Sequence, residues 1–313
     1  MKRLLAIVFA GFAATQSGAA PIEFDVAKLR LMSANAVVLD ASDGRAVYAK
    51  AADSVTPIAS LTKLMTAMVV LDASLPGDEM ITVDMDDFDY LKGSHSRLRM
   101  GSTLPRDEML RLALMASENR AASALARHYP GGAGAFVAAM NAKAESLGMT
   151  RTHYEDPTGL SPRNVSTAND LAKLVRAAAE YPVIRDYSTT PAHYVEVGPT
   201  GQTLGFNNSN ALVKNGAWDI HLQKTGYIRE AGRCVVMLAT IASRPVVIVL
   251  LDSIGKFTRL GDAQRVKYWL ETGETMPAPT ARPAVQKVTS KAAGKSSKRI
   301  QGKFASTSKG GRG

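Results

Sequence analysis

Strand-like runs lie on both sides of a helical middle region, and this order constrains the fold more than any other feature. Residues 36–40 and 46–49 flank Asp43 and Gly44, a turn signal that predicts a β-hairpin. Three more strand-like runs come late in the chain, at residues 220–225, 234–241 and 246–251. This order favours an α+β fold in which the hairpin joins the late strands in one antiparallel sheet.

The middle of the chain carries helical patterns. Residues 60–71 place Leu61, Leu64 and Met68 on one apolar face, after a loop that contains Pro57. Further helices are expected at residues 105–115, 120–129, 135–147, 166–180 and 257–272.

The two ends of the chain differ from its body. A positive start, an apolar run and small residues predict a signal peptide over residues 1–20, too short to span a bilayer of about 30 Å. Residues 277–313 are rich in Lys, Ser, Gly and Ala, which predicts a disordered tail. We therefore expect a periplasmic protein with its folded domain at residues 21–276. No lipid or transmembrane anchor is expected after cleavage, since the lone Cys234 lies far from the cleavage site.

The net charge of +10 belongs to the ends rather than to the folded domain. Residues 281–313 hold nine Lys or Arg and no Asp or Glu, and the signal peptide holds two more cations. The nearly neutral remainder argues against a nucleic-acid-binding domain. The tail suits at most a loose attraction to an anionic wall or membrane surface, and a merely solubilising end is the alternative.

Three short motifs carry the chemistry, and they occur in the order Ser60-Leu61-Thr62-Lys63, Ser117-Glu118-Asn119 and Lys224-Thr225-Gly226. The first two are weak alone, since S-x-x-K recurs at Ser253 and Ser306 and S-x-N at Ser33. The surrounding sequence distinguishes these three motifs from the recurrences elsewhere in the chain. The first opens a helix, the second lies between two helices, and the third ends an apolar strand. We expect one site assembled from these three elements.

Ser60 and Lys63 suit nucleophilic catalysis. A serine needs a base, and residues three apart share one face of a helix. A free lysine, with a pKa of about 10.4, stays protonated. Burial and the charge of Lys224 would lower the pKa of Lys63 and make it a general base. The backbone N–H groups of Ser60 and Tyr227 are the expected oxyanion hole.

The other motif residues suit a peptide substrate. Ser117 can relay a proton to a leaving amine, and Asn119 can bond to a substrate backbone. Lys224 and Thr225 suit a carboxylate, and Gly226 permits an extended peptide to approach the strand edge.

The sequence lacks the motifs that other catalytic and metal-binding sites require. The five histidines show no metal-ligand spacing, and neither a G-x-S-x-G elbow nor a nucleotide-binding glycine motif occurs. The acidic residues from Asp84 to Asp89 lack the glycine and the final glutamate of a calcium loop. We therefore expect neither a metal nor a cofactor.

The motif set is the signature of β-lactamases and penicillin-binding proteins. The stretches that begin at Pro57, Leu112, Met140, Asp156 and Leu222 resemble the D-alanyl-D-alanine endopeptidases known as penicillin-binding protein 7/8. The similarity covers residues 36–277 and excludes the signal peptide and the basic tail.

This resemblance implies a β-lactamase/transpeptidase-like fold, a five-stranded antiparallel sheet flanked by helices plus a mostly helical subdomain. It makes Ser60 the acyl-ester nucleophile, Lys63 the general base, Ser117 the third catalytic residue and Lys224 a substrate-binding lysine. The implied activity is hydrolysis of D-alanyl–meso-diaminopimelate cross-links in peptidoglycan. β-Lactam antibiotics are the implied covalent inhibitors.

Three alternatives stay open. A D-alanyl-D-alanine carboxypeptidase would share the site, although the chain lacks the appended β-rich domain and amphipathic anchor of such relatives. A β-lactamase would need a carboxylate that positions water, for which Glu155 and Asp156 are candidates. A non-catalytic peptidoglycan-binding protein would have no need of the full set of catalytic residues.

Overall fold

The computed structural model describes residues 24–214 and 216–278. Residues up to Met276 belong to one compact unit, and only Pro277 and Ala278 of the following unit are described. The expected signal peptide and nearly all of the expected tail therefore lie outside the described residues. Within the described part, no helix has the length and apolar character needed to cross a membrane.

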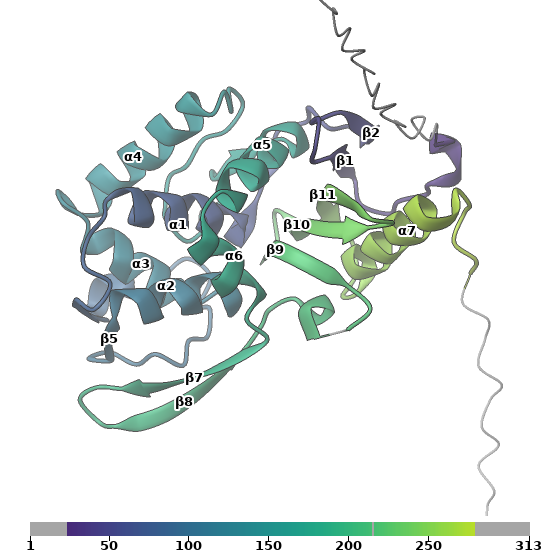
Figure 1. Ribbon diagram of the computed structural model, residues 1–313. Helices are drawn as coiled ribbons and strands as arrows, with labels where there is room; N and C mark the ends of the chain where they lie inside the picture. Colours follow the sequence, from purple (N-terminus) through teal and green to yellow (C-terminus); the bar gives the residue numbers. More distant parts are fainter. Residues whose placement is uncertain (1–23, 215, 279–313) are drawn as a thin grey trace, which may run out of the picture. The chain divides into compact units, whose positions relative to one another are not determined.

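A five-stranded antiparallel sheet forms one part of the fold (Figure 1). Its strands, in the order β2-β1-β11-β10-β9, are β2 (Ala46–Lys50), β1 (Asn35–Asp40), β11 (Arg244–Ser253), β10 (Gly232–Ile241) and β9 (Asp219–Ile228). The early hairpin joins the late strands through β1 and β11, where Ala36 pairs with Leu250 and Val38 with Ile248. The expected α+β fold with one antiparallel sheet is therefore confirmed, and β9 lies at the edge of that sheet.

Seven α-helices lie within the described residues: α1 (Lys63–Asp72), α2 (Arg106–Met115), α3 (Asn119–Arg127), α4 (Gly132–Ser146), α5 (Ala168–Ala179), α6 (Pro182–Thr189) and α7 (Thr258–Thr272). Six of them match expected helices, with starts displaced by up to three residues. The single apolar face expected for the first helix is wrong, because α1 is buried all round from Lys63 to Val70. Its central position explains this, since α1 contacts each helix from α2 to α6.

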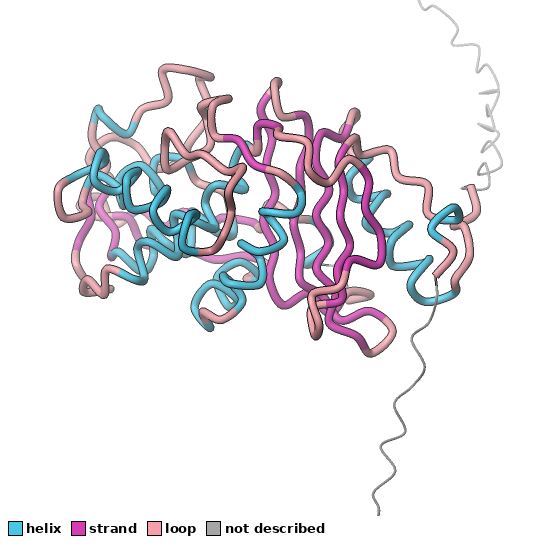
Figure 2. The backbone as a smooth tube through the Cα atoms, turned by 90° about the horizontal axis from the view of Figure 1, so that it is seen from above, coloured by secondary structure: helices cyan, strands magenta, loops and turns pink. Residues whose placement is uncertain are grey.

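The sheet is covered on both faces because its side chains alternate (Figure 2). Val37 and Val249 belong to a large apolar cluster that includes helices α1 to α6. Val38 and Ile248 belong to a second cluster with Trp269 of α7. Each central strand therefore buries apolar side chains in two cores, and the larger core holds the sheet and the helical part together.

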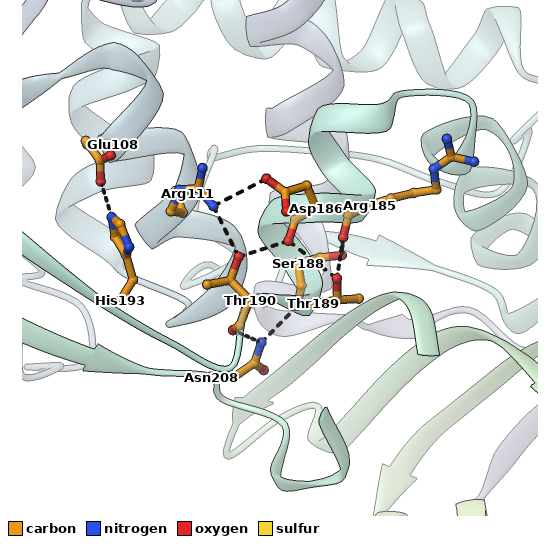
Figure 3. A network of polar contacts seen from close by, with 9 residues as sticks. All are labelled: Glu108, Arg111, Arg185, Asp186, Ser188, Thr189, Thr190, His193 and Asn208. Carbon is orange, nitrogen blue, oxygen red and sulfur yellow. Dashed lines mark hydrogen bonds and ion pairs between the residues drawn. The ribbon is translucent and has the colours of Figure 1, made fainter. Parts of the chain in front are cut away.

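The connection between α5 and β9 was not expected from the sequence. It contains α6 and a hairpin of β7 (Ala192–Val197) and β8 (Gln202–Asn207). Polar contacts fix the hairpin to its surroundings (Figure 3). His193 Nε2 lies 2.7 Å from Glu108 Oε2 on α2, and Asn208 Nδ2 donates to the carbonyls of Ser188 and Thr190. Gln223 of β9 donates to the Ser188 carbonyl and to Asn208 Oδ1, so this network helps to position that strand.

Four short strands complete the described β-structure. They are β3 (Thr56–Pro57), β4 (Met80–Thr82), β5 (Thr103–Pro105) and β6 (Val165–Ser166), paired as β3–β6 and β4–β5. Pro105 therefore ends a strand and precedes α2, instead of lying in the first turn of the helix as expected. Cys234, fully buried in β10, has its thiol pKa raised to about 12 by burial.

Candidate active site

The first motif lies in a tight turn immediately before a helix. Ser60 belongs to the 3₁₀ turn Ala59–Thr62, and α1 begins only at Lys63. Ala59 has a left-handed backbone with φ of 48°, and Thr62 Oγ1 donates to the Ala59 carbonyl at 2.8 Å. The spacing still brings Lys63 Nζ to 3.0 Å from Ser60 Oγ. The nucleophile candidate is thus held by a turn rather than by a regular helix.

Lys63 is fully buried, and its side-chain nitrogen has three acceptors. Nζ donates to Asn119 Oδ1 at 2.7 Å and to the Thr158 carbonyl at 2.6 Å. The third acceptor is Ser60 Oγ at 3.0 Å. The first two acceptors have no proton to give in return, so they fix the direction of the amine toward Ser60.

The pKa of Lys63 is shifted for one of the two expected reasons. Burial lowers it to about 8, while the carboxylates of Asp156 and Glu118 oppose that change. The expectation that the charge of Lys224 lowers the pKa of Lys63 is wrong. Burial, followed by the nearby charge of Lys63, lowers the pKa of Lys224 well below its usual value. The repulsion between the two buried amines thus lowers the pKa of Lys224 rather than that of Lys63.

The second and third motifs meet through one hydrogen bond. Ser117 lies between α2 and α3 in a left-handed conformation with φ of 62°. Lys224 Nζ donates to Ser117 Oγ at 2.7 Å and to the Thr225 carbonyl at 2.9 Å. The expectation that a strand ends at Lys224 is wrong, because β9 stays paired with β10 as far as Ile228. The buried lysine thus projects from the middle of an edge strand.

Glu118 and Asn119 serve the local structure as well as the site. Glu118 caps α3 by accepting from Arg120 N at 3.1 Å, and burial raises the pKa of its carboxyl. The Asn119 amide accepts from Lys63 and donates one proton to Ser94 Oγ at 2.8 Å. A second amide proton of Asn119 is left for a substrate carbonyl.

Two glycines enclose the turn that carries Ser60. A Cβ atom on Gly226 would lie 2.9 Å from the Ile58 carbonyl and 3.2 Å from Ser60 N. A Cβ atom on Gly159, whose φ is +82°, would overlap the Ala59 carbonyl. Gly226, expected to admit a substrate, is therefore also required by packing within the protein.

Thr225 and Tyr227 continue β9 past the buried lysine. Thr225 Oγ1 donates to Ser209 Oγ at 2.8 Å. The Tyr227 side chain is exposed, and the Arg233 guanidinium lies 4.4 Å from the centre of its ring. The backbone around Tyr227 therefore lies near Ser60, whereas its ring faces solvent.

Sequence reasoning missed two groups of the site. The Thr158 carbonyl belongs to the backbone, so no side-chain motif could indicate it. Arg259 is buried in the first turn of α7, and its Nε and Nη1 have no hydrogen-bond partner among the described residues. It lies close enough to Lys224 to lower the pKa of that lysine. A buried guanidinium with free N–H groups suits a carboxylate ligand.

The two carboxylates considered for a β-lactamase already have partners. Asp156 accepts from the N–H groups of Thr158 and Gly159 at 2.6 and 2.7 Å. Glu155 forms an ion pair with Arg163. These bonds shape the loop behind Lys63, and they leave neither carboxylate free to direct a water molecule.

Two cavities border residues of the second motif. The larger, of about 260 Å³, is lined by His95, Arg97, Ala116, Ser117, Glu118, Phe206 and Asn207. The smaller, of about 140 Å³, is bordered by Asn119 and Thr158 and by loop residues that include Tyr90, Leu91 and Leu160. Within the described residues, no group of three or more His, Cys, Asp or Glu side chains could hold a metal ion.

Comparison with known proteins places this site in a family. A sequence model described as D-alanyl-D-alanine carboxypeptidase, peptidase family S11, matches residues 22–255. The chain belongs to this family. It is therefore a serine-type D,D-peptidase with the β-lactamase/transpeptidase-like fold.

Curated members of the family resemble the chain over most of its length. A D-alanyl-D-alanine endopeptidase of Pseudomonas aeruginosa is 51% identical over 254 residues, which cover 81% of this chain and 82% of that protein. One from Escherichia coli is 47% identical and covers 89% of each chain. Among solved structures, the ampicillin-bound penicillin-binding protein D2 of Listeria monocytogenes is 28% identical. It has a TM-score of 0.67 and covers 77% of this chain and 98% of that one.

Proposed function

We propose that the chain hydrolyses the D-alanyl–meso-diaminopimelate cross-link of peptidoglycan through an acyl ester on Ser60. The geometry around Lys63 carries this proposal. A neutral amine keeps two N–H bonds, which Asn119 Oδ1 and the Thr158 carbonyl accept at 2.7 and 2.6 Å. The lone pair then faces Ser60 Oγ at 3.0 Å and can take its proton.

The reaction follows from this arrangement. Ser60 Oγ attacks the D-alanyl carbonyl carbon while its proton passes to Lys63. The N–H groups of Ser60 and Tyr227 stabilise the resulting oxyanion. Collapse of the intermediate breaks the amide bond, and the proton held by Lys63 passes to the leaving amine through the Ser117 hydroxyl, which Lys224 holds by a hydrogen bond. Lys63 is then neutral again. Water then attacks the acyl ester with Lys63 again as base, which frees Ser60 and the D-alanyl carboxylate.

The carboxylate beside the scissile bond is the recognition feature of the substrate. Thr225 and the free N–H groups of Arg259 suit that carboxylate, with Lys224 behind them. The edge position of β9 permits an extended peptide to pair with it, and Asn119 has a free amide proton for the peptide backbone. A terminal D-alanyl-D-alanine offers a similar carboxylate, which makes carboxypeptidase activity the second candidate.

One observation favours the endopeptidase, and two others argue against a β-lactamase and a pure binding protein. Relatives that are 51% and 47% identical over the aligned 254 and 278 residues are named endopeptidases. The carboxylates of Glu155 and Asp156 are occupied, which disfavours a β-lactamase. A pure binding protein would have no need of a buried lysine directed at a serine.

β-Lactams are proposed as covalent inhibitors because their strained amide, like the cross-link, lies next to a carboxylate. The relative from Listeria monocytogenes has been solved with ampicillin bound. We expect a fluorescent penicillin to label Ser60 and to be released slowly, since Glu155 and Asp156 are bonded to other groups of the loop.

The proposed location is the periplasm, reached through the signal peptide over residues 1–20. The basic tail at residues 277–313 would add a loose attraction to anionic wall or membrane surfaces. Deleting residues 281–313 and measuring binding to sacculi at low and high salt tests this attraction. Unchanged binding at low salt would remove the tail from the proposal.

The decisive experiment uses a purified cross-linked muropeptide dimer whose acceptor stem still ends in D-alanyl-D-alanine. Products are followed by mass spectrometry, with Ser60→Ala as the control. We expect two monomers from the wild type and none from the variant. Loss of one alanine from an intact dimer would instead identify a carboxypeptidase.

A further inference from the structure

The cavity of about 260 Å³ opens beside Ser117, on the side of the site from which the amine leaves. Ser117 is the proposed proton donor to that amine, and Lys224 and Thr225 of the carboxylate anchor lie next to it. The smaller cavity borders Asn119 and Thr158 instead, and so lies on the other side of Lys63. Groups attached to the leaving amine therefore enter the cavity beside Ser117.

One wall of this cavity is a loop that is fixed to the catalytic motif. Ser94 Oγ accepts from Asn119 Nδ2 at 2.8 Å, and the Ser96 hydroxyl bonds to the Glu118 carboxylate. Arg97 follows directly and lines the cavity. These bonds tie the loop to the Ser-x-Asn turn and so place Arg97 next to that turn.

The opposite wall is the end of β8, part of the hairpin that the sequence did not reveal. Arg97 Nη1 donates to the Gly205 carbonyl, and the guanidinium lies 5.8 Å from the centre of the Phe206 ring. Its remaining N–H groups have no acceptor among the described residues, and the side chain is exposed to the cavity. Lys214 bonds to Asn207 at the rim and adds a second cation.

The lining also contains one carboxyl group, but it is not free. Glu118 is buried and bonded to Ser96 and to Arg120 N, and burial raises the pKa of its carboxyl. The cavity therefore presents the exposed Arg97 guanidinium, which keeps N–H groups beyond the one bonded to Gly205, beside the Phe206 ring. That combination suits a short aliphatic chain that leads to an anion.

We infer that this cavity binds a second carboxylate on the leaving half of the cross-link, with Arg97 as its partner. This inference rests on the proposed function. The leaving diamino acid carries one carboxylate next to the scissile bond, a short methylene chain, and then a stem peptide with further carboxylates. The methylenes would lie on Phe206. D-Alanine, released by a carboxypeptidase, has no second carboxylate, so the cavity selects the cross-link.

The test compares Arg97→Gln, Arg97→Lys and a matched control, Arg99→Gln, which changes an exposed arginine in the same loop that does not line the cavity. Two rates are measured for each protein: kcat/KM for the cross-linked dimer and the rate constant for labelling by a fluorescent penicillin, which has no leaving stem. We expect the ratio of the first to the second to fall about 10- to 100-fold in Arg97→Gln. It should fall less in Arg97→Lys and stay at the wild-type value in Arg99→Gln.

A second substrate checks the cause. In a dimer whose acceptor-stem carboxylates are converted to amides, except for the one next to the scissile bond, wild-type cleavage should fall by a similar factor, and Arg97→Gln should cleave both dimers equally. An unchanged ratio in Arg97→Gln, or a parallel loss of cleavage and labelling, would overturn the subsite while wild-type cleavage upholds the proposed function. If the wild type cleaves no dimer at all, the proposed function fails first.

Discussion

Lys63 shows how one residue is prepared for proton transfer. Two acceptors at 2.6 and 2.7 Å leave a single direction for the lone pair, and that direction is toward Ser60. Burial lowers the pKa of Lys63 to about 8, which makes the neutral form accessible near physiological pH. The hydrogen bonds direct the lone pair of the Lys63 nitrogen toward Ser60, and burial makes that lone pair available.

A pH profile tests this preparation. The neutral amine is the reactive form, and its fraction rises with pH until the pKa is passed. Acylation by a fluorescent penicillin should therefore speed up about tenfold per pH unit below pH 8 and level off above it. A rate that stays flat across this range would argue against Lys63 as the base.

A conservative substitution gives a second test at the same residue. Lys63→Arg keeps the positive charge, but a guanidinium cannot lose its proton in this pH range. We expect acylation to fall at least about 100-fold, measured by rapid-quench labelling. The folded state is checked by thermal unfolding, and full labelling of a folded variant would contradict the mechanism.

The residues of the site differ in how well the sequence predicts them. Side chains in fixed spacing, such as Ser60 and Lys63, are predictable because one helical turn brings them together. The Thr158 carbonyl is not, since every residue has a carbonyl and only the fold selects one. The role of Arg259 could not be predicted from the sequence either, because it depends on Lys224 in an edge strand that lies far from Arg259 in sequence.

At the scale of elements, the turn that carries Ser60 is enclosed by two backbones. Gly226 of β9 and Gly159 of the loop behind Lys63 both touch it without side chains. β9 could be predicted as a strand, but its extension past Lys224 could not, because that depends on pairing with β10. The unexpected α6 and the β7–β8 hairpin follow the same rule, since they are fixed by contacts with α2 and β9.

Gly226→Ala tests whether close packing around the Ser60 turn is needed for activity. The added methyl group would lie 2.9 Å from the Ile58 carbonyl and 3.2 Å from Ser60 N, so the turn must shift. We expect penicillin labelling to slow at least about tenfold, since small misplacements of reacting groups are costly. Gly134→Ala in α4, where a Cβ meets open space, is the control and should label normally. Equal rates for the two variants would remove the packing argument.

The network that precedes β9 makes a separate prediction for stability. Asn208 is buried and donates to the carbonyls of Ser188 and Thr190. Asn208→Ala should lower the free energy of unfolding by about 1–3 kcal/mol, because buried acceptors lose their partner. The exposed Thr203→Ala on β8 should cost about 0.5 kcal/mol or less in the same denaturant titration. Similar values for both would show that the network contributes little.

For the whole molecule, one apolar cluster spans the sheet and the helices. Val37 and Val249 of the sheet belong to it together with Leu114, Leu125 and Phe136 of the helical part. The strand-like runs predicted the strands of this sheet and the pairing of the early hairpin with the late strands. Which helix covers which face could not be predicted, because it depends on contacts between segments far apart in sequence.

This shared core predicts cooperative unfolding. We expect the mature protein to give a single calorimetric transition, with equal calorimetric and van't Hoff enthalpies, because neither part can expose its face of the core alone. Two transitions, or a calorimetric enthalpy well above the van't Hoff value, would show that the helical part and the sheet unfold separately.

The two glycines around Ser60 limit the ways in which a bacterium can evolve resistance at this protein. A larger residue at either position moves the serine away from an antibiotic and from the cell wall alike, so such a mutant loses its function together with its sensitivity. Exposed side chains on the loop that contains Tyr90 and Leu91 can vary without moving the turn. Resistance mutations should therefore accumulate in that loop, at the border of the smaller cavity, and spare Gly159 and Gly226.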